Sequence, residues 1–292
     1  MLSLAGLKYR GIFSDHGGPI ESIEEGQIDV FGVPYYQANA RLKDGVRAVR
    51  AVQMYSDADG TGMSRCRSIA RHIAISEALE RWAYNRTVSS TDVDKYGLGV
   101  DPSSNGFAAF PGLTSKYARH HATLEAVERA VILNWWEGRL DGEFNRTRWR
   151  NVSALSFKIQ MNTVVVILVA KTNENNYAYG HAAGTSLEHA YERASLELRR
   201  HEWTIESWLS RNCRSIPDNQ FERRSLFFSS DVGYREFMNR VETRVGIETM
   251  SLEKVCDSEI SGPWSCYATV WRTLFKPPSS KFFQSDERYF YW

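Results

Sequence analysis

The 292-residue sequence has few cysteines, no long apolar run and no excess of charge of one sign. Its four cysteines, Cys66, Cys213, Cys256 and Cys266, form no Cys-x-x-Cys pair, which excludes a disulfide-dense scaffold and fits a reducing compartment. The longest apolar stretch, residues 164–170, is far shorter than the roughly 20 residues that a membrane-spanning helix needs. We therefore expect a cytoplasmic protein without a membrane anchor.

Charge and composition limit the kinds of partner. Lysine and arginine (36) nearly balance aspartate and glutamate (35), which gives a net charge of +1. Such a balance creates no overall field that attracts nucleic acid or an anionic membrane, so any anion site must be local. Hydrophobic residues make up 42% of the chain, enough for a substantial core. We expect a globular protein that binds neither nucleic acid nor membrane.

Two segments carry nearly the same acidic pattern within predicted helices. Residues 76–81 are Ser-Glu-Ala-Leu-Glu-Arg, and residues 124–129 are Leu-Glu-Ala-Val-Glu-Arg. Positions i, i+3 and i+4 lie on one helix face, where two glutamates repel each other unless a positive group sits between them. A single copy of this pattern is most often a solvated face with an ion pair inside the helix. Two copies in matched array favour a metal ion with bound phosphates.

The start of the chain favours strands and turns. Strands are predicted over residues 9–13, 28–36 and 46–55, with Gly and Asp between them. Residues 60–64 read as a turn, with Ser64 as the N-cap of a helix that continues to about Arg86.

Further along, a second helix is predicted to open near Thr114 or Ser115. Residues 151–171 suggest two short strands, the second of them rich in β-branched residues, as buried strands are. Residues 266–275 resemble another strand, and no linker composition divides the chain in two.

A third helix is predicted to follow residues 180–186 and to continue to about Trp208. Arg193, Glu197 and His201 share one of its faces with small residues, which leave room for a ligand or another helix. Each of the three helices follows a glycine and reaches its acidic position 15, 13 and 13 residues later. This recurrence suggests strand-turn-helix units packed around one composite site.

Three segments, residues 60–84, 105–136 and 180–201, resemble the signature regions of the YcaO family in the same order. The doubled Glu-x-x-Glu-Arg, the Ser-Asn-Gly before the second helix and the Gly-x-Ala-Ala-Gly before the third carry this resemblance. It implies an α+β fold, with mixed β-sheets and long helices around a central nucleotide cavity, in a single domain over residues 1–292. It also implies ATP and Mg2+ binding without the glycine-rich lysine loop of common NTPases, and the sequence has no such loop.

The activity that the resemblance implies is ATP-dependent activation of backbone amides in a ribosomally synthesised peptide. A nucleophile adds to the amide carbonyl and ATP phosphorylates the resulting oxygen, which turns a poor leaving group into a good one. The expected reaction is cyclodehydration of Cys, Ser or Thr to a thiazoline or oxazoline. Formation of a thioamide or amidine is an alternative, and so is a divergent subunit that no longer hydrolyses ATP and serves as a scaffold.

The resemblance also implies roles for individual residues. Hard oxygen donors suit Mg2+, and the implied ligands are four glutamates: Glu77, Glu80, Glu125 and Glu128. The implied nucleotide contacts, to which Arg193 is added from its helix face alone, are Arg81, Asn105, Arg129, Arg193, Glu197 and His201. No peptide-binding domain is fused to the chain, so a separate recognition protein is expected to present the precursor peptide. Pairing into a homodimer is common in the family.

The sequence departs from the family pattern at several places. Ile73 replaces a usual Ser of the first region, His201 replaces a usual Gln of the third, and Ala130 follows the second Glu-Arg where Asp is frequent. Azoline-forming members often end in a proline-rich tail, whereas residues 287–292 are Glu-Arg-Tyr-Phe-Tyr-Trp. These departures favour the scaffold alternative, while the retained carboxylates and arginines favour an enzyme.

Other residues that carry chemistry have simpler interpretations. His201-Glu202 begins a zinc-protease motif, but Ile205 stands where the second His is required. Among the remaining histidines, His181 is a better candidate for a ligand or base than His120 or His121. The tryptophans of the predicted helices are expected in the core rather than on a stacking surface: Trp135, Trp136, Trp203 and Trp208.

Overall fold

The structure, a computed structural model, describes residues 3–47, 53–98, 105–159, 163–211, 216–243, 252–284 and 286–292. The chain divides into two compact units. Unit 1 comprises Met1–Arg50, Asp57–Ala126 and Lys254–Phe275, and unit 2 comprises Ala51–Ser56, Val127–Glu253 and Lys276–Trp292. Because each unit is built from three separate segments, no single cut in the chain separates them. That the whole chain works as one domain stays a prediction.

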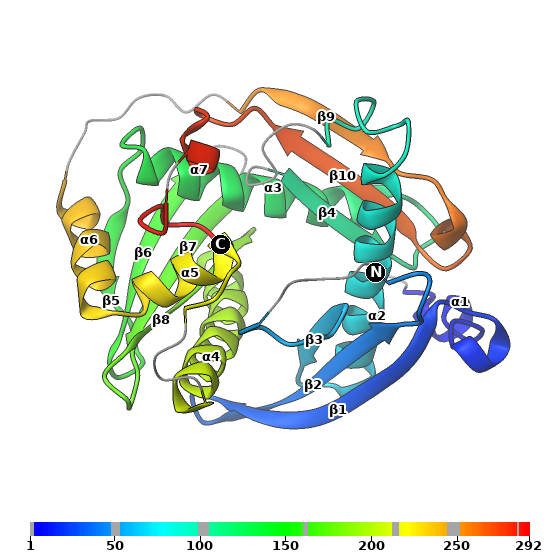
Figure 1. Cartoon of the computed structure of the whole chain (residues 1–292), viewed down its shortest axis with the longest axis horizontal. Coiled ribbons are helices and arrows are strands. Elements are labelled where there is room, and N and C mark those ends of the chain that lie inside the picture. The colour runs from blue at the N-terminus through cyan, green and yellow to red at the C-terminus, as the bar shows by residue number, and fades with distance from the viewer. Residues whose placement is uncertain are drawn as a thin grey trace. The chain divides into compact units, whose positions relative to one another are not determined.

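Unit 1 begins with a three-stranded antiparallel sheet in the order β1 (Ile20–Val30), β2 (Val33–Leu42), β3 (Gly60–Ser64). The two-residue turn between β1 and β2 consists of Phe31 and Gly32, both with positive φ, as the twist of a tight hairpin requires. The long helix α2 (Arg67–Val88) packs on β2 and β3 (Figure 1). The short helices α1 (Ala5–Lys8) and η1 (Ser14–His16) precede the sheet.

A second antiparallel sheet of unit 1 has the order β4 (Asn105–Phe110), β10 (Thr269–Phe275), β9 (Lys254–Glu259). The helix η3 (Pro263–Cys266) lies between β9 and β10 in the sequence. The helix α3 (Lys116–Trp136) contributes its first part to unit 1 and its second part to unit 2.

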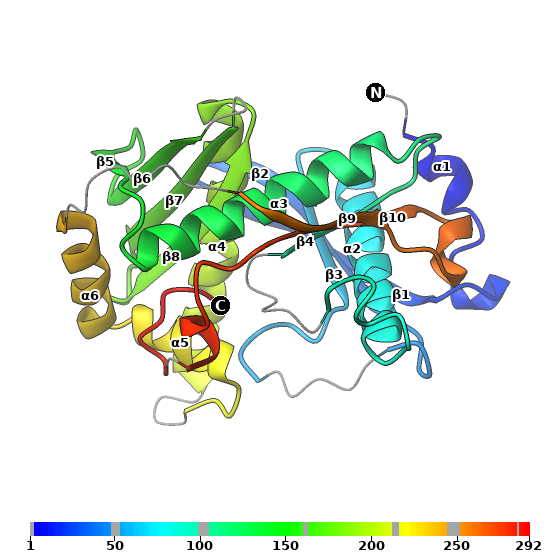
Figure 2. The ribbon, with the colours of Figure 1, turned by 90° about the horizontal axis from the view of Figure 1, so that it is seen from above.

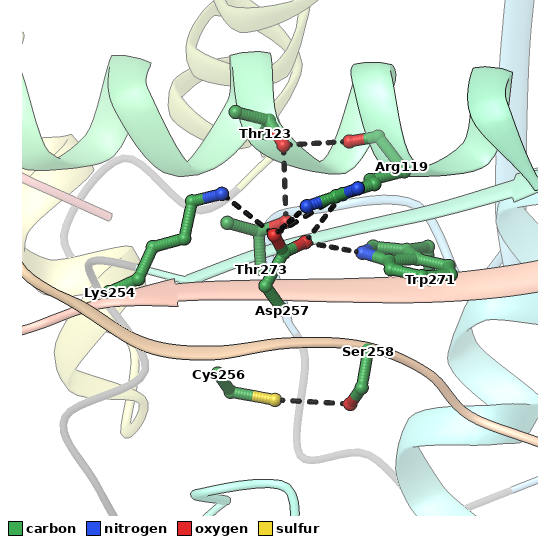
Figure 3. Close-up of polar contacts among 8 residues, drawn as sticks. All are labelled: Arg119, Thr123, Lys254, Cys256, Asp257, Ser258, Trp271 and Thr273. Atoms are coloured by element: carbon green, nitrogen blue, oxygen red, sulfur yellow. Dashed lines mark hydrogen bonds and ion pairs between the residues drawn. The ribbon is translucent and has the colours of Figure 1, made fainter.

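Asp257 of β9 joins the first part of α3 to this sheet (Figure 3). Its carboxylate accepts hydrogen bonds from Arg119 Nε at 3.1 Å, from Lys254 Nζ at 2.7 Å and from Trp271 Nε1 at 2.8 Å. Burial raises the pKa of Asp257, but the hydrogen bonds from Arg119, Lys254 and Trp271 outweigh it and hold that pKa well below its usual range. The carboxylate is therefore ionised at neutral pH and fixes the start of α3.

Unit 2 is built on a four-stranded antiparallel sheet in the order β5 (Glu143–Arg146), β6 (Val152–Ile159), β7 (Thr163–Lys171), β8 (Tyr177–Gly184). The helix α4 (Leu187–Arg211) packs on β7 and β8. Buried residues occupy most positions of β7, as its run of β-branched residues predicts.

The remaining elements of unit 2 are α5 (Gln220–Phe228), α6 (Asp231–Glu242), α7 (Lys281–Gln284) and the C-terminal residues. Figures 1 and 2 both show the C-terminal segment next to α5. Phe290 is 1% exposed and lies among the rings of Trp135, Phe228 and Phe237. An aromatic cluster of this kind supplies much of the apolar burial that holds the chain end in place. Among the described residues, no helix has both the length and the apolar character needed to cross a membrane.

The structure confirms the predicted α+β class and the three long helices, and it corrects several strands. Residues 9–11 follow α1 as a turn, and of the predicted strand 9–13 only Phe13 pairs, in an isolated bridge with Ile20. The predicted strand 28–36 spans the hairpin turn between β1 and β2. The predicted strand 46–55 lies partly outside the described residues, and its described positions are turn and bend. The strand predicted over residues 266–275 begins only at Thr269.

The glycine-rich segment 60–64 was predicted as a turn before the first long helix, and this prediction is wrong. Residues 60–64 form β3, Cys66 rather than Ser64 is the N-cap residue of α2, and residues 180–184 belong to β8. A Cβ atom on Gly60 or Gly106 would overlap the backbone of the helix that packs on it. These glycines allow the strand to pack closely against the helix and do not form a turn.

The tryptophan prediction is correct for two of the four residues. Trp135 and Trp208 are buried, and Trp136 is half-buried. Trp203 is 57% exposed on α4, so its assignment to the core is wrong.

Candidate functional site

Three of the four predicted metal-ligating glutamates lie in unit 1, and each accepts a hydrogen bond from a strand. The Glu77 carboxylate accepts from the Thr61 backbone N–H at 2.8 Å, and Glu80 accepts from the Ala109 N–H at 2.7 Å. Glu125 accepts from the Phe107 N–H at 2.9 Å. The strands that donate, β3 and β4, are at the edges of their sheets. The carboxylates thus satisfy edge N–H groups that no neighbouring strand can satisfy.

Glu80 has the most strongly perturbed carboxylate of this group. Burial raises its pKa well above the ordinary range, and the negative charges of Glu125 and Glu77 raise it further. The hydrogen bond from Ala109 and the charge of Arg81 offset this only in part. A partly buried carboxylate beside like charges is costly unless a proton or a cation neutralises it. Carboxylate oxygens are the kind of ligand that a hard divalent cation such as Mg2+ prefers.

Arg81 lies at the N-terminal end of β3. Its Nε donates to the backbone carbonyl of Asp59 at 3.2 Å, and its Nη2 is 3.4 Å from Glu77 Oε1. Asp59 itself is fully buried, and its side chain accepts from the Leu42 N–H at 2.9 Å. Asp59 was not among the predicted site residues, although the Asp-Ala-Asp-Gly run before β3 marks its position. Nearly half of the Arg81 side chain remains exposed and can meet an anion.

The fourth glutamate, Glu128, belongs to unit 2 and forms a different set of contacts. Its Oε1 is 2.7 Å from His181 Nδ1, and its Oε2 accepts from the Ala183 N–H at 2.9 Å. Burial raises the pKa of Glu128, but the hydrogen bond from His181 and the charge of Arg193 bring it below its usual value. Glu128 is therefore an ionised, buried carboxylate. His181, the better candidate among the histidines, lies beside a predicted metal ligand.

The predicted residues of α4 have three different environments. Arg193 Nη1 donates to the Ala183 carbonyl at 3.1 Å, beside the hydrogen bonds of Glu128. Glu197 is half-exposed and pairs with Arg200 at 3.0 Å. His201 is buried: its Nδ1 accepts from the Tyr179 N–H at 2.9 Å, and its Nε2 lies 2.7 Å from Ser225 Oγ.

Burial lowers the pKa of His201 to about 3, so the ring is neutral. Since Nδ1 accepts a hydrogen bond, Nε2 carries the proton and donates to Ser225. Both ring nitrogens are thus engaged by protein groups, which leaves neither for a hydrogen bond to a nucleotide.

Two predicted nucleotide contacts are less fully described. Arg129 is partly exposed on α3. The backbone of Asn105 pairs with Leu274 at the start of β4, and its side chain lies outside what the structure describes.

One construction recurs in three strand-helix pairs: β3 with α2, β4 with α3, and β8 with α4. In each pair a strand glycine lies against the helix backbone, namely Gly60, Gly106 or Gly180. In each pair a side chain of the helix then accepts an edge N–H of the strand. The predicted repetition of strand and helix is present, with Glu77 and Glu125 as hydrogen-bond acceptors. In the third pair the acceptor is His201 and not the predicted Glu197, and a composite site shared by the three pairs stays a prediction. Within the described residues, no three His, Cys, Asp or Glu side chains lie together in a way that could hold a metal ion.

Comparison with solved structures identifies the fold. YcaO from Methanopyrus kandleri, bound with AMPPCP and Mg2+, matches 93% of this chain and 88% of its own length, with a TM-score of 0.53 and 13% identity. The chain has a YcaO-type fold. The E. coli microcin synthetase McbBCD complex matches with the same TM-score of 0.53 at 10% identity, over 88% of this chain and 87% of that one. No protein-family model and no curated protein matches the sequence.

Proposed function

We propose that this chain is an ATP- and Mg2+-dependent enzyme that activates backbone amides of a ribosomally synthesised peptide by O-phosphorylation. The YcaO-type fold supports this proposal, since a structure of that fold binds AMPPCP and Mg2+. The observation that carries it is the partly buried Glu80, which accepts a hydrogen bond from the Ala109 N–H and lies near the charges of Glu77 and Glu125, with its pKa raised. Such a group is neutralised by a proton or by a cation, and Mg2+ bound with a triphosphate would be a suitable cation.

The proposal assigns Mg2+ to the four glutamates, Glu77, Glu80, Glu125 and Glu128. Each is held by a strand N–H, which fixes its carboxylate before any ligand binds. Mg2+ at these carboxylates would offset the negative charge of the phosphates.

The nucleotide contacts proposed are Arg81, Asn105, Arg129, Arg193 and Glu197. The arginines supply positive charge for the phosphate oxygens. His201 of α4 contacts β8 through Nδ1 and α5 through Nε2, and we assign it a positioning role.

The reaction proposed is cyclodehydration. The side-chain thiol or hydroxyl of a Cys, Ser or Thr in the peptide adds to the preceding amide carbonyl. The resulting oxygen attacks the terminal phosphorus of ATP, and ADP leaves. Loss of phosphate and a proton then forms the C=N bond of a thiazoline or oxazoline. If an external nucleophile replaces the side chain, the same activation gives a thioamide or an amidine.

The proposal includes a partner protein that presents the precursor peptide. The McbBCD microcin synthetase, which matches this chain in fold, is a complex of several proteins. Pairing with a second copy and a cytoplasmic location are also part of the proposal.

A thermal-unfolding scan tests nucleotide binding directly. The midpoint is measured with Mg2+ alone, ATP alone and both together. A ligand at a hundredfold excess over its dissociation constant adds about 2.7 kcal/mol of stability if it binds only the folded chain. We expect both together to raise the midpoint well beyond either alone, and Glu80→Gln to abolish this gain. Glu242→Gln, an exposed glutamate on α6, is the matched control and should retain it. A wild-type midpoint that none of the three conditions shifts would refute nucleotide binding by the isolated chain.

A scaffold subunit without ATP hydrolysis is the second candidate. His201 favours this candidate. It stands where the family usually has Gln, and both of its ring nitrogens are hydrogen-bonded to protein groups, Tyr179 and Ser225. ADP release on mixing the chain with ATP, Mg2+, a precursor peptide and its partner distinguishes the two candidates. The enzyme releases ADP in amounts that match the modified peptide, whereas the scaffold releases none.

A further inference from the structure

The strand β1 forms a long edge of the first sheet of unit 1. It spans 11 residues, and Figure 1 shows it as the outer strand of that sheet, with β2 beside it. Besides β2, the described residues offer β1 one further pairing, the isolated bridge between Phe13 and Ile20 at its start. An edge strand presents a row of backbone N–H and C=O groups that can pair with another strand.

The register of the hairpin shows which backbone groups of β1 face outward. Its two-residue turn makes Val30 and Val33 a hydrogen-bonded pair, and along an antiparallel ladder such pairs alternate with pairs that are not hydrogen-bonded. Ile23, Glu25 and Gln27 belong to the second kind, so their N–H and C=O groups point away from β2. Within the described chain, these outward groups have no hydrogen-bond partner.

Other edge strands of the protein have their N–H groups covered by side chains. Carboxylates accept hydrogen bonds from the N–H groups of Thr61 in β3 and of Phe107 and Ala109 in β4. In β8 the N–H groups of Tyr179 and Ala183 are likewise accepted by side chains. Since the described residues supply no such acceptor to β1, its edge is open to a strand from outside.

Gly26, in the middle of β1, fits the close approach of another backbone. Its φ lies outside the left-handed region, and no described atom lies within 4 Å of a Cβ atom built on it. The residue is exposed. Neither a turn nor packing against the described residues therefore requires a glycine here. A glycine inside a strand often marks a place where a ligand or another backbone comes close.

The side chains of β1 limit the partner by charge. Four of them are acidic and none is basic: Glu21, Glu24, Glu25 and Asp29. Glu25 pairs with Arg67 of α2 at 2.6 Å, and Arg71 lies 3.9 Å from it. Glu21 and Glu24 are exposed and form no ion pair with the described residues.

A strand laid beside β1 would place its side chains directly opposite these carboxylates. Side chains at opposite positions of neighbouring antiparallel strands have Cβ atoms about 4.5–5.5 Å apart, where opposite charges attract and like charges repel. A second copy of β1 would bring carboxylates against carboxylates. A strand that carries lysine or arginine would instead find the opposite charge.

We infer that the open edge of β1 binds an extended segment of another polypeptide that carries lysine or arginine at alternate positions. The segment would add a strand to the sheet, as in β-strand addition. Hydrogen bonds to the outward backbone groups of Ile23, Glu25 and Gln27 would supply affinity, and Glu24 would favour a basic sequence. The inference does not depend on the proposed function, and its test contains neither ATP nor Mg2+.

Fluorescence polarisation of a labelled peptide of four Lys-Val repeats, mixed with the full chain, tests the inference. At about 0.15 M salt, long-range attraction between exposed charges is largely screened. We expect saturable binding of one peptide per chain. The same peptide with a methyl group on every backbone nitrogen keeps its charge but loses its donors, and a Glu-Val peptide reverses the charge. Each should bind more weakly by about tenfold or more.

Two substitutions of Gln27 form a matched pair. Gln27→Pro removes the outward N–H without removing a hydrogen bond to β2, whereas Gln27→Ala keeps that N–H. The proline variant should bind the Lys-Val peptide about tenfold more weakly, and the alanine variant should bind it like the wild type. Glu24→Lys should weaken binding of the Lys-Val peptide and strengthen that of the Glu-Val peptide.

If Gln27→Pro does not fold, the methylated peptide makes the same test on the unchanged chain. Absence of saturable binding of the Lys-Val peptide would overturn the inference. Equal affinity for the methylated peptide, or wild-type affinity in a folded Gln27→Pro variant, would do the same. Sedimentation that shows wild-type dimers and Gln27→Pro monomers would also overturn it, because the edge would then pair with a second copy of the chain.

Discussion

Glu128 Oε1 and His181 Nδ1 are 2.7 Å apart, and the ring of His181 is in turn stacked on Tyr291 at 5.9 Å between centroids. The ring of His181 thus lies between the buried carboxylate of Glu128 and the C-terminal segment. Because the carboxylate accepts, His181 Nδ1 is the donor. This hydrogen bond is a main reason that the pKa of Glu128 stays below its usual value despite burial.

We predict that His181→Phe, which keeps an aromatic ring against Tyr291 but removes the donor, destabilises the chain by about 1.5–3 kcal/mol at pH 7. A lowered carboxylate pKa in the folded chain stabilises it above the unfolded value of about 4.3, and this gain is lost as the pH falls further. The difference between variant and wild type should therefore shrink between pH 5 and pH 3. Urea unfolding across this pH range measures it. The exposed His189→Phe is the control, and an equal loss there would contradict the role of the hydrogen bond.

Glu80 should change the pH dependence of stability in the opposite direction. Its folded-state pKa is raised, so ionising it costs stability as the pH rises above the unfolded value of about 4.3. Glu80→Gln removes that cost and still offers an oxygen to the Ala109 N–H. Without Mg2+, we expect the variant to be more stable than the wild type at pH 7 and above, by about 1 kcal/mol or more, with the gain vanishing near pH 4. Thermal unfolding of both proteins at several pH values tests this expectation. A variant less stable than the wild type at pH 8 would contradict the repulsion of Glu80 by Glu77 and Glu125.

The glycines of the edge strands provide a steric test. A Cβ atom on Gly106 would overlap the Ala122 carbonyl and the Ala126 nitrogen of α3. We expect Gly106→Ala to cost about 1–3 kcal/mol, the usual cost of forcing extra volume into a packed contact. In the part of the chain that the structure describes, no atom lies within 4 Å of a Cβ atom built on Gly26 of β1, so Gly26→Ala is the matched control with a change under about 0.5 kcal/mol. Similar losses in both variants would show that the contact with α3 is not the cause.

The helices could be predicted from the sequence because their pattern is local. Glu77 and Glu80, like Glu125 and Glu128, lie on the predicted helices, and α3 opens within two residues of the predicted start. The short strands β3 and β8 could not be predicted from the sequence. Gly60 and Gly180 resemble turn residues unless the helix against which they pack is known. Their place is decided by tertiary contact, which overrides local propensity.

The site was predictable only as a set of candidate residues. The sequence places carboxylates on helix faces, but their hydrogen bonds to strand N–H groups join positions 16 to 55 residues apart. The hydrogen bonds of His201 could not be predicted for the same reason, because its two partners lie on other elements, β8 and α5. Trp203 shows the limit of composition arguments, since a large aromatic residue on a helix is not always buried.

Arg224 provides the last prediction, because it is 1% exposed and holds the C-terminal segment through backbone carbonyls. Its guanidinium donates to the carbonyl oxygens of Phe282 at 2.6 Å, Asp286 at 3.1 Å and Tyr291 at 3.4 Å. A lysine ammonium is a compact group that cannot reproduce this planar fork, so carbonyls would be left buried without donors. We expect Arg224→Lys to cost about 2–4 kcal/mol in urea unfolding.

The neighbouring Arg223→Lys is the control, since Arg223 is partly exposed and donates to the carbonyls of Pro217 and Asp218. It should cost less than about 1 kcal/mol. If Arg224 anchors the chain end, proteolysis of native Arg224→Lys should release C-terminal peptides before the rest of unit 2 is cut. Cleavage that begins elsewhere, at the wild-type rate, would mean that the aromatic contacts of Phe290 hold the segment without Arg224.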